Sequence, residues 1–304
     1  MKITFDNNIA YNIHMQFPES FDTIIYRNFN SDLRNHTDVE LRNHYNIHGK
    51  NEGRKCSAIS SRDNLKTYIS KIANINCLEI GPFDSPVLSG RNVKYFDVLS
   101  QEQLRNRAIK INRVSNLNNI PYIDYVNEIG DLSIINEKFD IVLSCHSIEH
   151  QINLIKHLID VSKLLQSGGC YVIICPDKRY CFDHFINETT IADVINNNTD
   201  AKKHSIKSVI EHRALVCHND SVRHWNNDHG YPNYYNNKNL ILNAVDEYNK
   251  TEDYIDVHSM QFTPASFENI INTLNAIHYL DLYVDKVYNT QRNSLEFFAI
   301  LRKP

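Results

Sequence analysis

The chain alternates between two hydrophobic patterns from about residue 61 onward. Short, largely apolar runs that end beside a polar residue are typical of strands in a parallel sheet. These runs cover residues 77–80, 93–97, 123–126, 139–145 and 170–175. Between the last two, apolar residues recur at helical spacing from Leu154 to Leu165, and Gly168–Gly169 is expected to close that helix. The alternation predicts βαβ units and therefore a parallel sheet covered by helices.

The C-terminal part of the chain changes character. Thr263 followed by Pro264 predicts the start of a helix that continues through Leu274. Two strands follow, at 280–287 and 295–301, joined by a short Asn-rich turn. A terminal hairpin on a parallel sheet is foreign to the classical dinucleotide-binding fold. The C-terminal hairpin therefore distinguishes the predicted fold from the classical dinucleotide-binding fold.

The N-terminal part of the chain is predicted to form short helices. Thr37 and Glu40 have the spacing of a capping box, and Gly49 and Gly53 are expected to stop the helix that follows. The predicted divisions are a helical accessory region at 1–60, a main domain at 61–304, and an insertion in that domain at about 178–262.

Composition and charge exclude several classes of protein. Of the 304 residues, 42% are hydrophobic and 22% are charged, as in ordinary globular proteins. A formal net charge of −4 without a basic stripe argues against a nucleic-acid partner. The seven cysteines form no C-x-x-C pair, which argues against a disulfide framework and a thiolate zinc site. The N-terminus lacks the apolar core of a secretory signal, and no run has the length of a membrane span, so we expect a cytoplasmic location.

A candidate nucleotide site lies where the first two strands end. Gly81 follows the first strand and allows a tight turn, while Asp97 ends the second strand, where its carboxylate can accept both hydroxyls of a ribose. Pro82, Asp84 and Pro86 replace small residues of the G-x-G-x-x-G fingerprint, so a pyrophosphate is not expected. The alternative interpretation of this segment is an ordinary buried strand and turn.

A series of segments resembles the class I S-adenosylmethionine-dependent methyltransferases. They are Leu78-Glu-Ile-Gly81, Tyr95-Phe-Asp97, Phe139 to His150, Leu165-Gln-Ser-Gly-Gly169 and the closing hairpin. The resemblance covers roughly residues 63–304 and implies a doubly wound, mostly parallel seven-stranded α/β sheet whose last strand is antiparallel. It also implies S-adenosyl-L-methionine as the cofactor.

The same resemblance implies roles for individual residues at the cofactor. Those residues are Glu79, Gly81 and Pro82 at the methionine end, Asp97 at the ribose, Asp131 near the adenine, and Cys145 and His146 on the floor of the site. Asp124 competes with Asp131 for the adenine position. Because the second and third glycines of the first loop are missing, the resemblance does not predict the backbone conformation from Pro82 to Pro86.

The insertion carries a narrower resemblance. Pro176-Asp-Lys-Arg-Tyr-Cys-Phe-Asp-His184, the stretch from His218 to Gly230, and Asp256-Val-His258 with Phe262-Thr-Pro264 are similar to a methyltransferase subgroup found among surface-polysaccharide genes. The helical segment before residue 60 likewise resembles a module that accompanies glycosyltransferases. These resemblances imply a sugar or sugar-nucleotide acceptor in glycan biosynthesis.

The insertion also concentrates groups that can act as bases. A sugar hydroxyl is a poor nucleophile until a base or a metal lowers its pKa, and histidine suits this task near neutral pH. The expected catalytic residues are His224 or His229, and then His258. Capping a turn is the alternative role for any single one of them. A divalent metal bound by these histidines and Asp228 is a further alternative, but their spacing fits no specific motif, so no metal is expected.

Other polar and aromatic residues of the insertion are predicted to bind the acceptor. They are Asp177, Lys178, Arg179, His184, Trp225 and Asp228. Lys178 and Arg179 could clamp a phosphate of a nucleotide sugar, with surface solvation as the alternative. Trp225 could stack on a sugar face or belong to a local core. After the fourth strand, Glu149 and His150 are assigned structural roles.

The resulting hypothesis is a methyltransferase that O-methylates a sugar or nucleotide-sugar hydroxyl. Its expected partner is a small-molecule or glycan substrate, with neither a nucleic acid nor a membrane span, and a homo-oligomer is left open. The alternatives are a catalytically inactive binding or scaffold protein on the same fold and N-methylation of an amino sugar. A nicotinamide-dependent sugar oxidoreductase and a metal hydrolase built on the histidine-rich loop complete the list.

Overall fold

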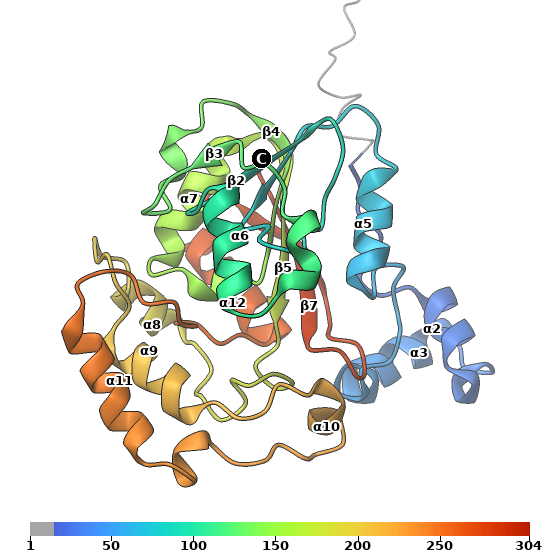
Figure 1. Ribbon diagram of the computed structural model, residues 1–304. Helices are drawn as coiled ribbons and strands as arrows, with labels where there is room; N and C mark the ends of the chain where they lie inside the picture. Colours follow the sequence, from blue (N-terminus) through green and yellow to red (C-terminus); the bar gives the residue numbers. More distant parts are fainter. Residues whose placement is uncertain (1–14) are drawn as a thin grey trace, which may run out of the picture.

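The computed structural model describes residues 15–304, so the expectations that fall on residues 1–14, including the lack of a secretory signal, lie outside it. A seven-stranded sheet with the strand order β3-β2-β1-β4-β5-β7-β6 forms its centre (Figure 1). The strands β1 to β5 pair in parallel with one another, and β7 runs antiparallel to both β5 and β6. The predicted seven-stranded, mostly parallel sheet with a C-terminal antiparallel hairpin is confirmed.

The strands and helices have the following bounds. The strands are β1 (Cys77–Ile80), β2 (Val93–Asp97), β3 (Tyr125–Val126), β4 (Phe139–Cys145), β5 (Leu165–Pro176), β6 (Tyr283–Tyr288) and β7 (Glu296–Arg302). The helices up to β4 are α2 (Thr23–Phe29), η1 (Ser31–Leu33), α3 (Asp38–His44), η2 (Tyr45–Gly49), α4 (Lys50–Glu52), α5 (Arg62–Ser70), α6 (Gln101–Lys110), η3 (Val114–Asn119) and η4 (Leu132–Ile134). Those after β4 are η5 (Ile148–His150), α7 (Leu154–Leu164), α8 (Ile191–Asn196), α9 (Ile206–Ile210), η6 (Glu211–Leu215), α10 (Ser221–Trp225), η7 (Asn233–Tyr235), α11 (Asn239–Lys250) and α12 (Pro264–Ala276).

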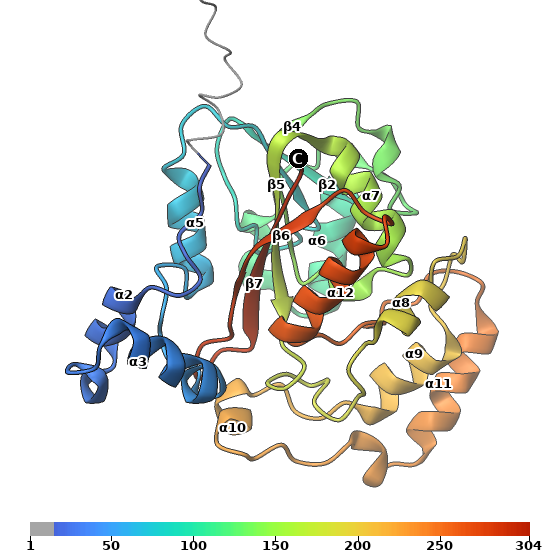
Figure 2. The same cartoon turned by 180° about the vertical axis from the view of Figure 1, so that it is seen from behind.

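The central strands are apolar on both faces because helices cover both faces. On one face, Leu78 and Val142 pack with the apolar sides of α7 and α12, which Figure 2 shows over the sheet. On the other face, Ile141 and Val172 pack with α5 and with the segment around Phe17. Burial on both sides accounts for the continuous apolar runs in the sequence.

Two predicted helix ends are wrong for reasons of packing. The helix after β4 ends at Leu164, and Gly168–Gly169 lies in β5, where the register with β4 shifts. A Cβ at Gly169 would lie 2.9 Å from the Gln166 carbonyl oxygen, so this glycine permits a close approach of two backbones. In the N-terminal region, the helical chain continues through Gly49, whose Cβ would lie 2.1 Å from the Tyr26 hydroxyl, and it ends at Gly53 in the left-handed conformation.

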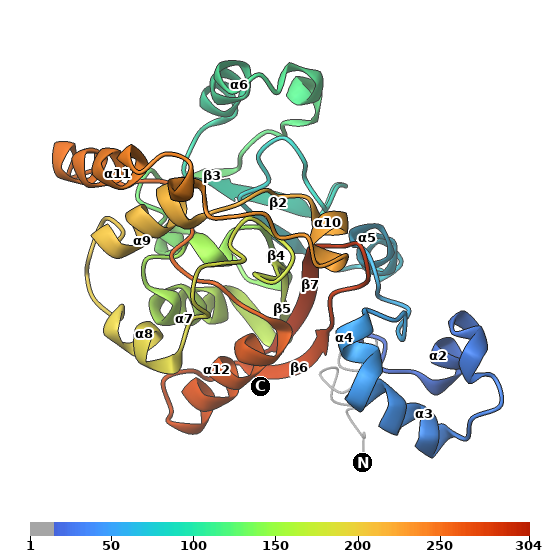
Figure 3. The same ribbon diagram turned by 90° about the horizontal axis from the view of Figure 1, so that it is seen from below.

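The insertion lies beneath the carboxyl ends of the parallel strands. Figures 1 and 3 show α8, α9, α10 and α11 grouped at this end of the sheet, whereas α2 and α3 lie to the side, beyond α5. The capping box predicted from Thr37 and Glu40 is present at α3, and α12 begins at Pro264 after Thr263, as predicted, with Thr263 and Ser266 forming a further capping box. The division of the chain at residue 60 stays a prediction. No helix in the described part of the chain combines the length and the hydropathy that a membrane span requires.

Candidate functional site

The first part of the candidate site is the point where the strand order reverses. β1 lies between β2 and β4 in the sheet. From β1 the chain continues to β2 and β3 on one side, and from β4 it continues to β5 on the other side. Such a switch point leaves a crevice outside the carboxyl ends of the strands. Gly81, with φ of +69°, stands at this point, and a Cβ there would meet only Ser147 atoms, at 3.9 Å. The backbone at Gly81 is therefore open to a ligand.

Glu79 fixes the loop that follows β1. Its carboxylate is buried and accepts hydrogen bonds of 2.8 Å from the backbone N–H groups of Val87 and Leu88. Burial raises the pKa of Glu79 to about 7, although the two backbone donors act in the opposite direction. Asp84 is also buried, and Arg113 Nη1 donates to it at 3.0 Å. Two carboxylates thus hold a loop that lacks the second and third glycines of the fingerprint.

Asp97 presents a carboxylate at the end of β2. Its Oδ1 accepts a hydrogen bond of 3.0 Å from Leu99 N, and no side-chain donor within residues 15–304 pairs with it. Burial raises the pKa of Asp97 to about 6, so the carboxylate is mostly ionised at neutral pH. An ionised, partly satisfied carboxylate at this position suits a pair of donor hydroxyls.

The remaining predicted cofactor residues differ in their local contacts. Pro82 is buried within the loop after Gly81. Asp131 caps η4 by accepting from Ser133 N and Ser133 Oγ, whereas Asp124 Oδ2 accepts from Tyr95 N. Both aspartates are therefore occupied by backbone groups, and neither is singled out for the adenine.

His146 occupies a strained position directly after β4. Its φ is +50°, a conformation that non-glycine residues rarely adopt, and such strain is concentrated at functional sites. His146 Nε2 lies 2.7 Å from Glu296 Oε1, and Arg62 pairs with the same carboxylate. Cys145 precedes it, and burial raises the pKa of the Cys145 thiol well above its usual value, so this cysteine is not a nucleophile.

The second part of the candidate site is a buried polar cluster next to His146. Within residues 15–304, five buried side-chain atoms lack a hydrogen-bond partner: Glu149 Oε1 and Oε2, His150 Nδ1, Asp183 Oδ1 and His204 Nε2. These residues belong to η5 and to the insertion. Leaving such atoms unpaired costs free energy of about 1–3 kcal/mol each, so their concentration in one place indicates a site for a polar ligand.

His258 lies at the centre of this cluster. Its Nδ1 is 2.6 Å from Asp183 Oδ2, and because a carboxylate only accepts, Nδ1 carries the proton. The lone pair is then on Nε2, which lies 3.8 Å from Glu149 Oε1. Glu149 Oε1 is in turn 3.7 Å from His146 Nδ1, so Glu149 stands between the end of β4 and His258. A histidine base oriented by a carboxylate is the arrangement that general-base catalysis requires.

Two further histidines complete the surroundings of His258. His150 Nδ1 lies 3.0 Å from Asp256 Oδ1, at angles outside those of a hydrogen bond, and Asp256 also binds Arg107. Burial acts to lower the pKa of His150, but the nearby carboxylates outweigh it and raise that pKa. His212 Nδ1 accepts from the backbone N–H of His258, and burial lowers the pKa of His212 to about 4. His212 is therefore neutral near pH 7.

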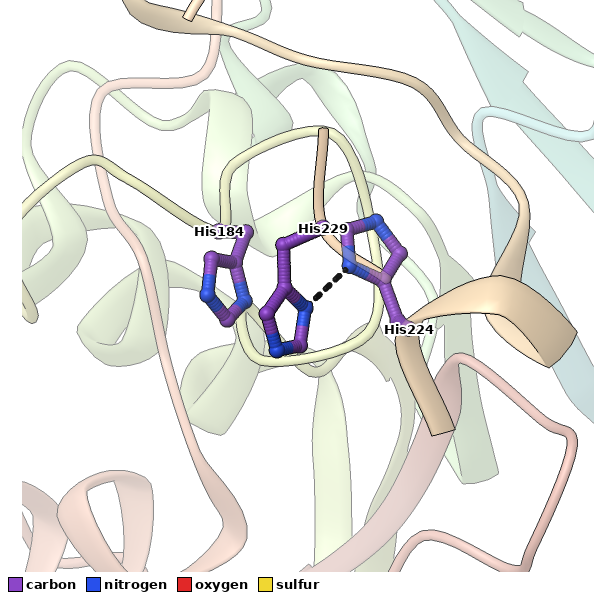
Figure 4. A group of neighbouring side chains, drawn as sticks. All are labelled: His184, His224 and His229. Atoms are coloured by element: carbon purple, nitrogen blue, oxygen red, sulfur yellow. Dashed lines mark hydrogen bonds between the residues drawn. The ribbon is translucent and has the colours of Figure 1, made fainter. Parts of the chain in front are cut away.

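The two histidines ranked first from the sequence lie in a separate group. Figure 4 shows His224 and His229 beside His184, with a distance of 3.0 Å between the two Nδ1 atoms of His224 and His229. His184 stacks on His229 with the ring centroids 3.8 Å apart. These three residues, called the three-histidine cluster below, thus bring together two predicted catalytic residues and one predicted substrate residue.

The other predicted substrate residues are engaged within the protein. Asp177 is fully buried and accepts hydrogen bonds from Arg179 and from Thr290 Oγ1. Lys178 Nζ donates to the backbone carbonyl of His184 at 2.9 Å. Asp177 and Arg179 therefore neutralise each other and leave no free charge for a phosphate.

Trp225 and Asp228 are likewise occupied. The indole stacks on Tyr180 with centroids 3.8 Å apart, and its Nε1 donates to the Ser294 carbonyl at 2.8 Å. This agrees with the local-core alternative for Trp225. Asp228 is exposed and pairs with Arg223 at 2.7 Å.

Sequence reasoning missed Glu149, His150 and Asp183 as members of the site. Glu149 and His150 lie in η5, shortly after β4, a position at the cofactor edge that could have marked them. Asp183 gave no signal, because its contact with His258 spans 75 positions of the chain. A polar hollow between the N-terminal helices and β6, lined by Arg42, Tyr45 and Lys286 among others, contains none of the unsatisfied buried atoms.

No family model matches the chain, and no curated protein matches its sequence. Among solved structures, the CcbJ methyltransferase from Streptomyces caelestis is similar at 11% identity and a TM-score of 0.40, over 84% of this chain and 95% of that one. An S-adenosylmethionine-dependent methyltransferase from Clostridium acetobutylicum has 11% identity and a TM-score of 0.41, over 87% and 98% of the two chains. Magnesium protoporphyrin IX methyltransferase from Synechocystis has 12% identity and a TM-score of 0.38, over 93% and 100%. Likenesses at this level assign neither an activity nor residue roles to this chain.

Proposed function

We propose that this chain is a class I S-adenosylmethionine-dependent methyltransferase that acts on a hydroxyl group of a sugar or sugar nucleotide. The proposal rests on the polar groups that gather at the carboxyl ends of the parallel strands. There, Gly81 and Asp97 stand at the switch point of the strand order, and a buried cluster of unsatisfied polar atoms lies beyond His146.

The residues at the switch point fit this cofactor. The open backbone at Gly81 admits the methionine end, and the Asp97 carboxylate can accept the two ribose hydroxyls. Glu79 contributes indirectly, because it holds the loop between Gly81 and Leu88 in place. When bound, S-adenosylmethionine supplies an electrophilic methyl group.

The Asp183–His258 pair is our candidate for the general base. A hydroxyl about 2.8 Å from His258 Nε2 can donate its single proton to that nitrogen. Glu149 Oε1, 3.8 Å from Nε2, is left to accept from a second hydroxyl of the same acceptor. His258 Nε2 would take the proton that the acceptor hydroxyl loses when it receives the methyl group. Asp183 holds the imidazole in the required tautomer and stabilises the imidazolium that forms.

A polyhydroxylated acceptor suits the cluster because its unsatisfied atoms include three carboxylate oxygens, two from Glu149 and one from Asp183. Such oxygens accept hydrogen bonds, and sugar hydroxyls supply the donors. None of the three solved structures named above is described as a sugar methyltransferase, so the sugar acceptor rests on this cluster and on the insertion. N-methylation of an amino sugar would use the same base and is an outcome of the test.

The test begins with calorimetric titration of S-adenosylhomocysteine. We expect micromolar binding to the wild type and at least tenfold weaker binding to Asp97→Asn, because the amide replaces one ribose acceptor with a donor. Asp246→Asn, which changes an exposed aspartate on α11, is the matched control and should bind as the wild type does. Absence of binding to the wild type would contradict the methyltransferase assignment.

The acceptor is then sought by incubating the protein with S-adenosylmethionine and a panel of sugar nucleotides. Transfer is measured as methylated product by mass spectrometry, and fragmentation places the methyl group on oxygen or nitrogen. Cofactor binding without transfer to any hydroxylated or amino sugar would favour the inactive binding protein over the enzyme.

A further inference from the structure

The three-histidine cluster is assembled from two distant segments. His184 lies in the loop after β5, His224 lies in the last turn of α10, and His229 returns to the same place five residues later. That return requires a tight reversal, in which Asn227 and Gly230 adopt left-handed conformations with φ of +60° and +64°. Figure 4 shows the three rings facing one another at this reversal.

The outward nitrogens of two rings are bound to backbone carbonyls. His184 Nδ1 donates to the Arg179 carbonyl at 2.9 Å, and His224 Nε2 donates to the His218 carbonyl at 3.1 Å. A carbonyl oxygen only accepts, so both protons are on these outer nitrogens. The lone pairs are then on His184 Nε2 and His224 Nδ1. Metal-binding histidines typically have this arrangement, with the far N–H bound to a carbonyl or a carboxylate.

The inward nitrogens are close enough for one ion. One ring nitrogen from each of the three histidines lies within 4.8 Å of the others, and His224 Nδ1 accepts a hydrogen bond of 3.0 Å from His229 Nδ1, whose proton a bound ion would replace. Nitrogens bound to one tetrahedral zinc ion at about 2.1 Å lie about 3.4 Å from one another. His184 stacks nearly parallel on His229, so binding an ion requires the His184 ring to tilt until its Nε2 points toward the shared centre.

The charge state and the neighbours favour a transition metal. Burial lowers the pKa of all three histidines, which favours the neutral form that binds a metal. The set contains no carboxylate, because Asp228 is held by Arg223. Three imidazoles without an oxygen ligand suit zinc, cobalt, nickel or copper rather than magnesium or calcium.

We propose that His184, His224 and His229 bind a single divalent transition-metal ion of the Zn²⁺ type. Three protein ligands leave the fourth coordination position open to water or to an oxygen of a bound molecule. This site is separate from the Asp183–His258 pair and does not depend on the proposed methyl transfer. The two sites are linked by neighbouring residues, because Asp183 binds His258 and the next residue, His184, belongs to the three-histidine cluster.

Titration with Co²⁺ tests the proposal on the full-length, chelator-treated protein. We expect one equivalent to bind and to give the intense visible absorption of tetrahedral cobalt, which Zn²⁺ then abolishes by displacement. Each of His184→Ala, His224→Ala and His229→Ala should weaken Co²⁺ binding at least tenfold and remove the absorption. X-ray absorption of the zinc-loaded wild type should show three nitrogen ligands from imidazole, and this measurement does not depend on the folding of any variant.

Two variants serve as controls. His48→Ala removes an exposed histidine of the N-terminal region, and His258→Ala removes the centre of the other polar cluster. Both should keep the wild-type cobalt spectrum, and circular dichroism should confirm that all variants are folded. The proposal is overturned if the wild type binds no ion at micromolar concentration, if binding persists in the three cluster variants, or if it is lost in His258→Ala instead. Because none of these readouts uses S-adenosylhomocysteine, failure here is distinguishable from failure of the proposed function.

Discussion

At the scale of single residues, Glu79 shows how a buried carboxylate can organise a ligand loop. Its two oxygens accept the backbone N–H groups of Val87 and Leu88, so the loop after Gly81 is fixed by a side chain. In the G-x-G-x-x-G fingerprint, small residues permit the corresponding close packing. This arrangement removes the Glu79 carboxylate from water, and that burial raises the pKa of Glu79 to about 7.

The pKa of Glu79 predicts a specific dependence of stability on pH. Because the folded-state pKa is raised from 4.5 to about 7, the folded protein holds this proton more tightly than the unfolded chain does. The resulting stabilisation is fully present below about pH 4.5 and is lost as the pH rises through about 7. Relative to Glu79→Gln, the unfolding free energy of the wild type should fall by up to about 3 kcal/mol between these limits, at about 1.4 kcal/mol per pH unit.

The measurement is urea unfolding of both proteins across this pH range, with the difference plotted against pH. Glu137→Gln is the control, because Glu137 is exposed and its pairing with Lys94 lowers its pKa. Because the lowered pKa places the titration of Glu137 below pH 4.5, its difference curve should be nearly flat between pH 4.5 and 7. A flat curve for Glu79 would mean that its carboxyl titrates alike in the folded and unfolded states.

At the scale of elements, the loop that follows β5 connects the two polar clusters. The Phe182 ring packs against the rings of His212 and His258. Asp183 then binds His258, and His184 joins the three-histidine cluster. Residues 182–185 form turns, in which successive side chains point in different directions, so one short loop supplies both clusters.

Asp183→Asn should separate catalysis from cofactor binding. The amide keeps the size of the side chain but removes the negative charge that orients His258 and stabilises its imidazolium, so the rate of methyl transfer should fall by about 10²-fold or more. The affinity for S-adenosylhomocysteine should stay within about twofold of the wild type. The measurements are transfer kinetics with the acceptor found in the screen, and calorimetry.

Asp200→Asn, at an exposed position of the same insertion, is the matched control and should leave the rate unchanged. A wild-type rate in Asp183→Asn would remove the Asp183–His258 pair from the mechanism. Parallel loss of the rate and of cofactor binding would instead show that Asp183 supports the fold of the site.

At the scale of the whole molecule, Gly53 is a point where three parts of the chain meet. The N-terminal helices end there, Arg292 N of the β6–β7 turn donates to the Gly53 carbonyl at 2.9 Å, and Trp225 comes from the insertion. A Cβ at Gly53 would lie 2.5 Å from Arg292 N and 2.6 Å from the Trp225 ring. Only glycine permits this approach.

Gly53→Ala should therefore destabilise the protein more than a change of backbone conformation alone does. Gly130 has a similar φ, +72° against +63°, but its Cβ would meet only Val98, at 3.9 Å, so Gly130→Ala is the matched control. Both variants incur the cost of the left-handed conformation, and Gly53→Ala adds a clash with backbone atoms. We expect its loss of unfolding free energy to exceed that of Gly130→Ala by about 1–3 kcal/mol in denaturant unfolding. Equal losses would mean that the three parts shift apart without cost.

The sequence by itself determined the sheet. Strands buried on both faces require continuous apolar runs, and helices that cover them require helical periodicity, so β1, β2, β4, α7, α12 and the terminal hairpin were predictable from local pattern. The crevice at Gly81 and Asp97 was predictable for the same reason, because both residues directly follow or end a recognisable strand. Gly49 and Gly168–Gly169 were misread, because their role is to admit neighbours that are distant in the chain or in an adjacent strand.

Only the tertiary structure decided how the polar residues of the insertion are grouped. The insertion consists of short helices and loops without a period, so no local rule states that Asp183 meets His258 or that His184 meets His224 and His229. From the sequence, both Trp225 and Asp177 were plausible substrate ligands. In the structure Trp225 stacks on Tyr180, and Asp177 accepts hydrogen bonds from Arg179 and Thr290. Hydrogen bonds between side chains depend on distances of a few tenths of an ångström, and in loops those distances are set by long-range packing.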